Sequence, residues 1–169
     1  MHDAVIKPTR RSKGNYFHQA SDAPKPLAAS VRLRAAFGAV DAMAIVWHGR
    51  YSQYCEEAYA QLTRSCGISY HDFFQAGLRA PIVQVHIDYF ESLMLEEEFT
   101  VTARLVWCEG ARMNVEYIFT KTGGIVAATG YTVHMFTDVS GMPLLSVPPL
   151  IEKLRQGWAR GELACQQGS

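Results

Sequence analysis

The sequence has no excess of charge of either sign, because sixteen Lys and Arg residues balance sixteen Asp and Glu among 169 residues. Without a net field, the chain is not expected to bind nucleic acid or an anionic membrane surface. It also lacks a run of roughly 18 apolar residues and the continuous apolar segment of a signal peptide. We therefore expect a soluble protein that is neither exported nor inserted into a membrane.

Cysteine is scarce, and its spacing lacks the CxxC pairs that are typical of metal sites. The four cysteines are Cys55, Cys66, Cys108 and Cys165. We interpret them as reduced thiols, which favours a cytoplasmic location. His86 and Asp88 would share one strand face, but two ligands without a third do not predict a metal site. No GxSxG elbow is present, which disfavours a serine nucleophile. No phosphate-binding loop ending in GKS or GKT is present either, and no cofactor is expected.

The chain is long enough to bury the core of one domain without disulfides or metals. Residues 1–26 are rich in Lys, Arg, Ser and Pro and have neither the strand period nor the helix period, which predicts a flexible arm. One folded domain is expected over residues 27–159. Residues 160–169 are expected to form a frayed tail.

Between the two ends, the hydrophobic periods predict one strand, one long helix and then four strands. Residues 30–37 alternate apolar and polar positions, whereas apolar residues from Tyr51 to Leu62 recur at helical spacing. A short helical turn is expected at residues 71–77 and a closing helix at 148–161. The four later strand candidates span residues 80–90, 98–108, 111–121 and 124–138.

This order of elements predicts an α+β fold. The turns at Glu109-Gly110 and at 122–124 are short enough for hairpins, so the last strands should pair antiparallel. Such a sheet of about five strands buries one face by wrapping round the long helix, which is the hotdog fold. Because an open sheet edge invites pairing with another chain, we expect a homodimer or a homotetramer.

Asp41 lies in an apolar run after the first strand and seven residues before His48, where the long helix is expected to begin. The first N–H groups of a helix have no partner inside it and carry the positive end of the helix dipole. If residues 42–47 loop back, Asp41 can approach a bound carbonyl whose oxygen is polarised by the N–H near His48 or Gly49. A carboxylate opposed to an oxyanion donor is the chemistry that thioester hydrolysis requires.

The stretch DAMAIVWHGRYSQYCEEA resembles the signature of the 4-hydroxybenzoyl-CoA thioesterase branch of hotdog proteins. The resemblance covers about residues 31–149 and implies an acyl thioesterase acting on an acyl-CoA or an acyl-carrier-protein thioester. It implies that Asp41 is the catalytic carboxylate and that the main-chain N–H of His48 polarises the carbonyl. The positions that correspond to the rest of the signature, and would contact substrate, are Ala44, Ile45, Val46, Trp47 and Tyr51.

The sequence departs from this signature at one position, where Ala44 replaces the usual Gly. If that position requires a positive φ angle or close approach of the substrate, alanine is unfavourable there. A non-catalytic module that binds acyl thioesters is therefore one alternative. A hotdog dehydratase acting on hydroxyacyl thioesters is another, although His48 lacks the Pro-rich loop that usually accompanies it.

Single residues also have simpler interpretations. Asp41 is a residue type that commonly caps a turn after a strand, and Tyr51 is expected in the core or a pocket wall. Glu56 matches the helix glutamate of the family, but Glu56 and Glu57 fall away from the apolar stripe of the helix. We expect them at an interface or in solvent, with a catalytic role as the backup should Asp41 not be the catalytic group.

Overall fold

The structure is a computed structural model that describes residues 14–163. Within these residues, five strands form one antiparallel sheet in the order β1-β3-β4-β5-β2. In chain order the elements are β1 (Leu27–Arg34), the 3-10 helix η1 (Phe37–Ala39), α1 (Arg50–Ser65), α2 (Tyr70–Gln75), β2 (Ile82–Tyr89), β3 (Glu98–Val106), β4 (Arg112–Lys121), β5 (Val126–Met135) and α3 (Pro149–Ala159).

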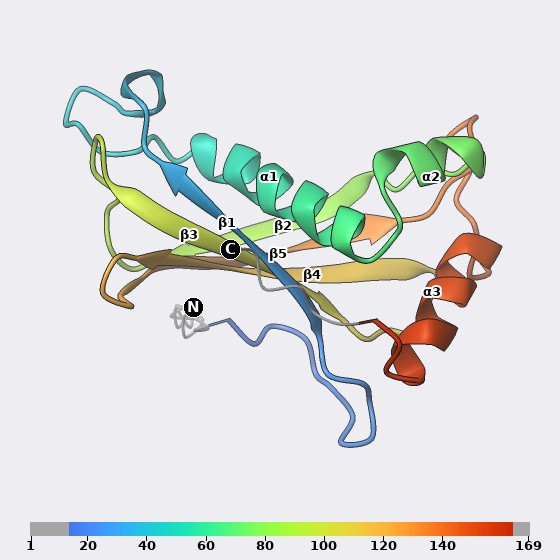
Figure 1. Cartoon of the computed structure of the whole chain (residues 1–169). Coiled ribbons are helices and arrows are strands. Elements are labelled where there is room, and N and C mark those ends of the chain that lie inside the picture. The colour runs from blue at the N-terminus through green and yellow to red at the C-terminus, as the bar shows by residue number, and fades with distance from the viewer. Residues whose placement is uncertain (1–13, 164–169) are drawn as a thin grey trace, which may run out of the picture.

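Helix α1 runs along one face of the sheet, and α2 continues from its C-terminal end (Figure 1). The buried side chains on α1, including Tyr51, Ala58 and Leu62, recur every three or four residues, so they form one stripe. The sheet supplies alternate positions such as Val101 and Phe119, which are fully buried. The long helix packed on a curved antiparallel sheet confirms the predicted α+β hotdog fold.

The strand boundaries differ slightly from those predicted. β1 begins at Leu27 because Leu27 pairs with Leu105 of β3 and is itself buried. On β2 the pairing register with β5 shifts between Ile82 and Gln84, so strict alternation holds only from Gln84 to Tyr89. Strand β2 lies at the edge of the sheet and leaves much of its length exposed.

The described part of the N-terminal arm lies against the face of the sheet opposite α1 (Figure 1). The main-chain N–H groups of Tyr16 and Phe17 donate to Glu116 Oε1 on β4 at 2.7 and 3.1 Å. Residues 1–13 and 164–169, which belong to the expected arm and tail, lie outside the described residues. The domain boundaries therefore stay a prediction.

None of the helices in residues 14–163 has the length and the apolar composition needed to cross a membrane. Cys55, Cys66 and Cys108 are free thiols in the structure. Burial raises the pKa of Cys55 well above the usual value for a thiol, so its thiolate is disfavoured.

Candidate active site

The loop that carries Asp41 folds back on itself. Val40 and Val46 form an isolated antiparallel bridge, and the Ala44 N–H donates to the Asp41 carbonyl oxygen at 3.0 Å. Asp41 Oδ1 also accepts hydrogen bonds from the N–H groups of Met43 at 2.8 Å and Ile45 at 3.3 Å. The carboxylate therefore caps its own turn, as Asp often does.

Ala44 occupies the left-handed region of backbone space, with a φ of 59°. This is the position at which the resembled signature has Gly. Glycine adopts such a φ freely, whereas a Cβ makes it unfavourable by roughly 1–2 kcal/mol. The turn thus forms with alanine at a conformational cost that the surrounding hydrogen bonds offset.

The loop leads directly into α1, whose first residue is Arg50 and whose N-cap is Gly49. Within residues 14–163, the main-chain N–H groups of His48 and Gly49 donate no hydrogen bond. The indole ring of Trp47 packs over Gly49, and a Cβ at Gly49 would overlap this ring. Two unpaired donors at the positive end of a helix form a site suited to an oxyanion.

A cavity of about 240 Å³ opens beside this helix start. Its wall is made by residues from the loop, α1, the end of β2 and the segment after it, namely Ile45, Val46, His48, Tyr51, Tyr89, Phe90, Glu91 and Ser92. Tyr51 and Tyr89 pack edge to face with ring centroids 4.8 Å apart. Burial raises the pKa of Tyr51 to about 12, so this phenol stays protonated at neutral pH.

The structure brings together four of the seven residues that the sequence predicted for the site. Ile45, Val46, His48 and Tyr51 line the cavity. The other three, Asp41, Ala44 and Trp47, are not among its lining residues in the single chain. Asp41 is nevertheless held to Ile45, a residue of the cavity wall, by two hydrogen bonds.

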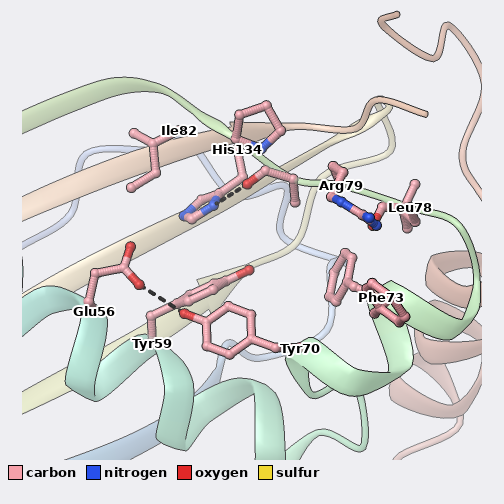
Figure 2. Close-up of a pocket in the computed structure, with 11 residues that line it drawn as sticks. Glu56, Tyr59, Tyr70, Phe73, Leu78, Arg79, Ile82 and His134 are labelled. Carbon is pink, nitrogen blue, oxygen red and sulfur yellow. Dashed lines mark hydrogen bonds between the residues drawn. The ribbon is translucent and has the colours of Figure 1, made fainter. Parts of the chain in front are cut away.

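A second cavity, of about 380 Å³, lies between α1, α2 and the start of β2 (Figure 2). Its wall is largely aromatic, and the labelled side chains point into it from both sides. The lining residues are Glu56, Tyr59, Tyr70, Phe73, Phe74, Leu78, Arg79, Ala80, Pro81, Ile82 and His134. An aromatic wall with a few polar groups is typical of a site for a small organic ligand.

The polar groups of the second cavity come from α1, α2 and β5 and, with Arg79, from the segment before β2. The Tyr70 hydroxyl donates to Glu56 Oε2 at 2.8 Å. The Tyr59 ring is buried and stacks on the imidazole of His134, with centroids 4.5 Å apart. Burial lowers the pKa of His134 below its usual value and raises the pKa values of Tyr59 and Tyr70, so all three are neutral at neutral pH.

Several of these cavity residues were not predicted from the sequence. Tyr89 and Glu91 reach the start of α1 because β2 pairs with β5 at the sheet edge, a contact between distant segments. Glu56 was expected in solvent or at an interface, and its hydrogen bond with Tyr70, fourteen residues later, was not predicted. A Ser69–Asp72 capping box was the sequence signal for the helix that carries Tyr70.

No cluster of three or more His, Cys, Asp or Glu side chains that could hold a metal is found in residues 14–163. His86 and Asp88 do share one strand face, as predicted, with His86 Nε2 3.1 Å from Asp88 Oδ2. This pair lies on the face of the sheet that contacts the N-terminal arm, since Asp88 also accepts a hydrogen bond from the Tyr16 hydroxyl.

The sequence also matches a known protein family over the residues that form the site. The sequence pattern that defines the thioesterase-like superfamily matches residues 35–155. The chain belongs to this superfamily. The match includes the Asp41 loop and both cavities, and it confirms the predicted family and the prediction of a thioester hydrolase.

Solved structures of similar fold include two proteins described as CoA thioesterases and a protein solved in complex with CoA. A DHNA-CoA thioesterase from Staphylococcus aureus has a TM-score of 0.72 and 20% identity, over 84% of this chain and 99% of that chain. A 1,4-dihydroxy-2-naphthoyl-CoA thioesterase from Synechocystis has a TM-score of 0.67 and 16% identity, over 79% and 96%. A third protein, from Staphylococcus aureus and solved in complex with CoA, has a TM-score of 0.69 and 15% identity, over 86% and 88%.

Proposed function

We propose that this superfamily member hydrolyses an acyl-CoA thioester, with Asp41 as the catalytic carboxylate and the main-chain N–H of His48 as the oxyanion donor. The observation that carries this proposal is the start of α1. There, unpaired N–H groups lie beside a cavity with both apolar and polar wall residues, and hydrogen bonds to Asp41 hold the preceding loop. Negative charge that develops on a thioester oxygen is stabilised at such a helix end.

The Asp41 carboxylate is held through one oxygen only. Oδ1 accepts the N–H groups of Met43 and Ile45, whereas Oδ2 accepts no hydrogen bond within residues 14–163. Oδ2 can attack the carbonyl carbon, which forms a mixed anhydride and expels the thiolate, and water then hydrolyses the anhydride to the acid and restores the Asp41 carboxylate. Alternatively, Oδ2 can take a proton from a water that attacks the carbonyl directly. Both routes end in a free carboxylic acid and a thiol.

Coenzyme A is the proposed carrier because the structural relatives named above act on CoA thioesters or bind CoA. An acyl carrier protein is the alternative carrier. The apolar wall formed by Ile45 and Val46 would exclude water from the reacting carbonyl. A cytoplasmic location, expected from the reduced cysteines, belongs to the same proposal.

We further propose that the enzyme works as a homodimer through strand β2. Among the described strands, β2 pairs only with β5, and Val85 on it is 55% exposed. Antiparallel pairing of two β2 strands would set the Ile82 end of one against the Tyr89 end of the other. The aromatic cavity of one protomer would then adjoin the His48 cavity of its partner.

In such a dimer the aromatic cavity is the proposed site for the acyl group. Its stacked Tyr59 and His134 rings favour a flat aromatic group, and Glu56 offers an acceptor for a hydroxyl. The naphthoyl substrate of the Synechocystis relative is a hydroxylated aromatic group of this kind. A homotetramer would keep the same dimer and the same two cavities.

The test is thiol release from a panel of aromatic and aliphatic acyl-CoA and acyl-carrier substrates, compared with Asp41→Asn. Release that is unaffected by this change would move the chemistry to Glu56 or Glu57. Tight binding without release would identify a binding module instead. A single turnover in labelled water then separates the two roles of Asp41, since label in the Asp41 carboxylate identifies an anhydride intermediate.

A further inference from the structure

The N-terminal segment of residues 14–17, here called the N-terminal clamp, is attached to the outer face of the sheet by groups from three strands. Glu116 on β4 is buried and accepts the two consecutive N–H groups of Tyr16 and Phe17. The Tyr16 hydroxyl donates to Asp88 Oδ2 on β2 at 2.8 Å and lies 2.6 Å from Thr129 Oγ1 on β5. The clamp therefore crosses β4, β5 and β2.

Aromatic packing supports the same attachment. The Tyr16 and Phe17 rings each lie 5.1 Å, between centroids, from the ring of Tyr131 on β5. Gly14 has a φ of 107°, and a Cβ there would lie only 3.2 Å from the Ile118 side chain. Backbone geometry, ring packing and a buried carboxylate thus agree on one position for the clamp.

This position matters because β2 is an edge strand. Within the described residues it is hydrogen-bonded as a strand to β5 alone, so its free side is less restrained than that of an inner strand. The Tyr16 hydroxyl contacts both β2 and β5, at Asp88 and Thr129, which are paired in the sheet. It thereby adds a side-chain link between the two strands near the end of β2.

The link acts one residue away from the cavity beside His48. Successive strand residues point to opposite faces, so Asp88 faces the clamp while Tyr89 faces α1, where it packs on Tyr51. Beyond Tyr89 the chain leaves the ladder, with the N–H groups of Phe90 and Glu91 both bonded to the Ala127 carbonyl. A restraint on Asp88 therefore fixes the wall of the cavity from Tyr89 onward.

We propose that Tyr16 is a positioning residue for thioester hydrolysis, which holds β2 and the Tyr89 wall in place from the opposite face of the sheet. This inference rests on the proposed function of the His48 cavity. Tyr16 itself touches neither the substrate nor the helix start. It acts through Asp88 and Thr129 on the position of the strand.

The test is Tyr16→Phe in the full-length protein, which keeps the ring and removes only the hydroxyl. For an acyl-CoA that the wild type hydrolyses, KM is expected to rise about three- to tenfold with kcat within about twofold, because a displaced wall weakens substrate binding. Amide exchange in residues 82–92 is expected to quicken about tenfold. Tyr131→Phe, which removes a hydroxyl from the same face, is the matched control and should behave as wild type.

A double variant distinguishes the proposed link from a general loss of packing. Combining Tyr16→Phe with Asp88→Ala should raise KM little beyond the larger single effect, because each change removes one partner of the same hydrogen bond. The proposal is overturned if Tyr16→Phe lowers the melting temperature but leaves KM and exchange in β2 unchanged. Additive effects of the two changes would overturn it as well.

Failure of the proposed function would be recognised separately. If neither wild type nor any variant releases thiol from the substrate panel, thioester hydrolysis is wrong and Tyr16 positions nothing for it. Exchange in residues 82–92 still reports whether the clamp restrains β2 in that case. Asp41→Asn should lower kcat about 10²- to 10⁴-fold without changing this exchange, so the two readouts respond to different residues.

Discussion

Asp41 and Ile45 are joined by two hydrogen bonds that run in opposite directions. The Asp41 N–H donates to the Ile45 carbonyl at 2.8 Å, and the Ile45 N–H donates to Asp41 Oδ1 at 3.3 Å. One carboxylate oxygen thus shapes the loop, and the other is left for the proposed chemistry. The two interpretations of Asp41, as a turn cap and as a catalytic group, are compatible.

The first prediction concerns Asp41→Asn. An amide oxygen can still accept the N–H groups of Met43 and Ile45, so the loop should form and the melting temperature should change little. The neutral side chain is a poor base and nucleophile, and kcat should fall about 10²- to 10⁴-fold. Thiol release and circular dichroism melting measure the two effects, and full activity in the variant would contradict the assignment.

Ala44→Gly is expected to stabilise the chain. Relieving a φ of 59° at a residue with a Cβ should raise the free energy of unfolding by about 1 kcal/mol. Urea unfolding measures this change. Ala42→Gly is the matched control, because Ala42 has no positive φ and its change to Gly should leave stability equal or lower.

Glu56→Gln tests the proposed acyl site. The amide keeps the size of the side chain but weakens its hydrogen bonds to Tyr70 and to a substrate hydroxyl. We expect kcat/KM for a hydroxylated aromatic acyl-CoA to fall about tenfold and that for a simple aliphatic acyl-CoA to stay within about twofold. The neighbouring Glu57→Gln serves as control, and equal losses for both substrates would argue against the site.

Val85→Lys tests the proposed dimer. A charge at the exposed middle of β2 should oppose pairing between two copies, so light scattering should detect a monomer and thiol release should fall. Ile125→Lys places the same charge at the β4–β5 turn, where Ile125 is 54% exposed, compared with 55% for Val85. This control should leave both the mass and the activity unchanged.

Buried His134 predicts a loss of stability in weak acid. Burial depresses its pKa in the folded chain, so between that pKa and the unfolded value of about 6.5 the unfolded chain binds more protons. The contribution of this residue is therefore full above about pH 6.5 and declines as the pH falls through this window. Melting temperatures at pH 7.5 and 5.5 measure the decline, and a smaller decline in His134→Gln would assign it.

The pH range in which His134 lowers stability lies above the range in which carboxylates do so. Hydrogen bonding lowers the pKa values of Asp72, Glu98 and Asp138 below their usual values, so their contributions are lost only at lower pH. All three groups are partly exposed, and solvent screens their effect. A melting curve that stays flat from pH 7.5 to 5.5 would contradict the role of His134.

The elements themselves were predictable because their signals are local. The apolar stripe from Tyr51 to Leu62 has the helix period, and Thr122-Gly123-Gly124 supplies the turn of a hairpin. The role of Asp41 as a turn cap was also predictable, since a turn cap bonds to residues only two to four positions away. The sequence raised the possibility that position 44 requires a positive φ angle, and Ala44 has a φ of 59° in the structure.

The sequence by itself determined the order of strands and helices, the thioesterase signature around Asp41 and the start of the long helix at the end of that loop. Only the tertiary structure decided that Tyr89 would reach Tyr51, that Tyr59 would stack on His134, and that the N-terminal clamp would hold Asp88. Periodicity and capping depend on residues a few positions apart. Contacts between segments far apart depend on which apolar faces pack together, and that choice is made by the folded chain as a whole.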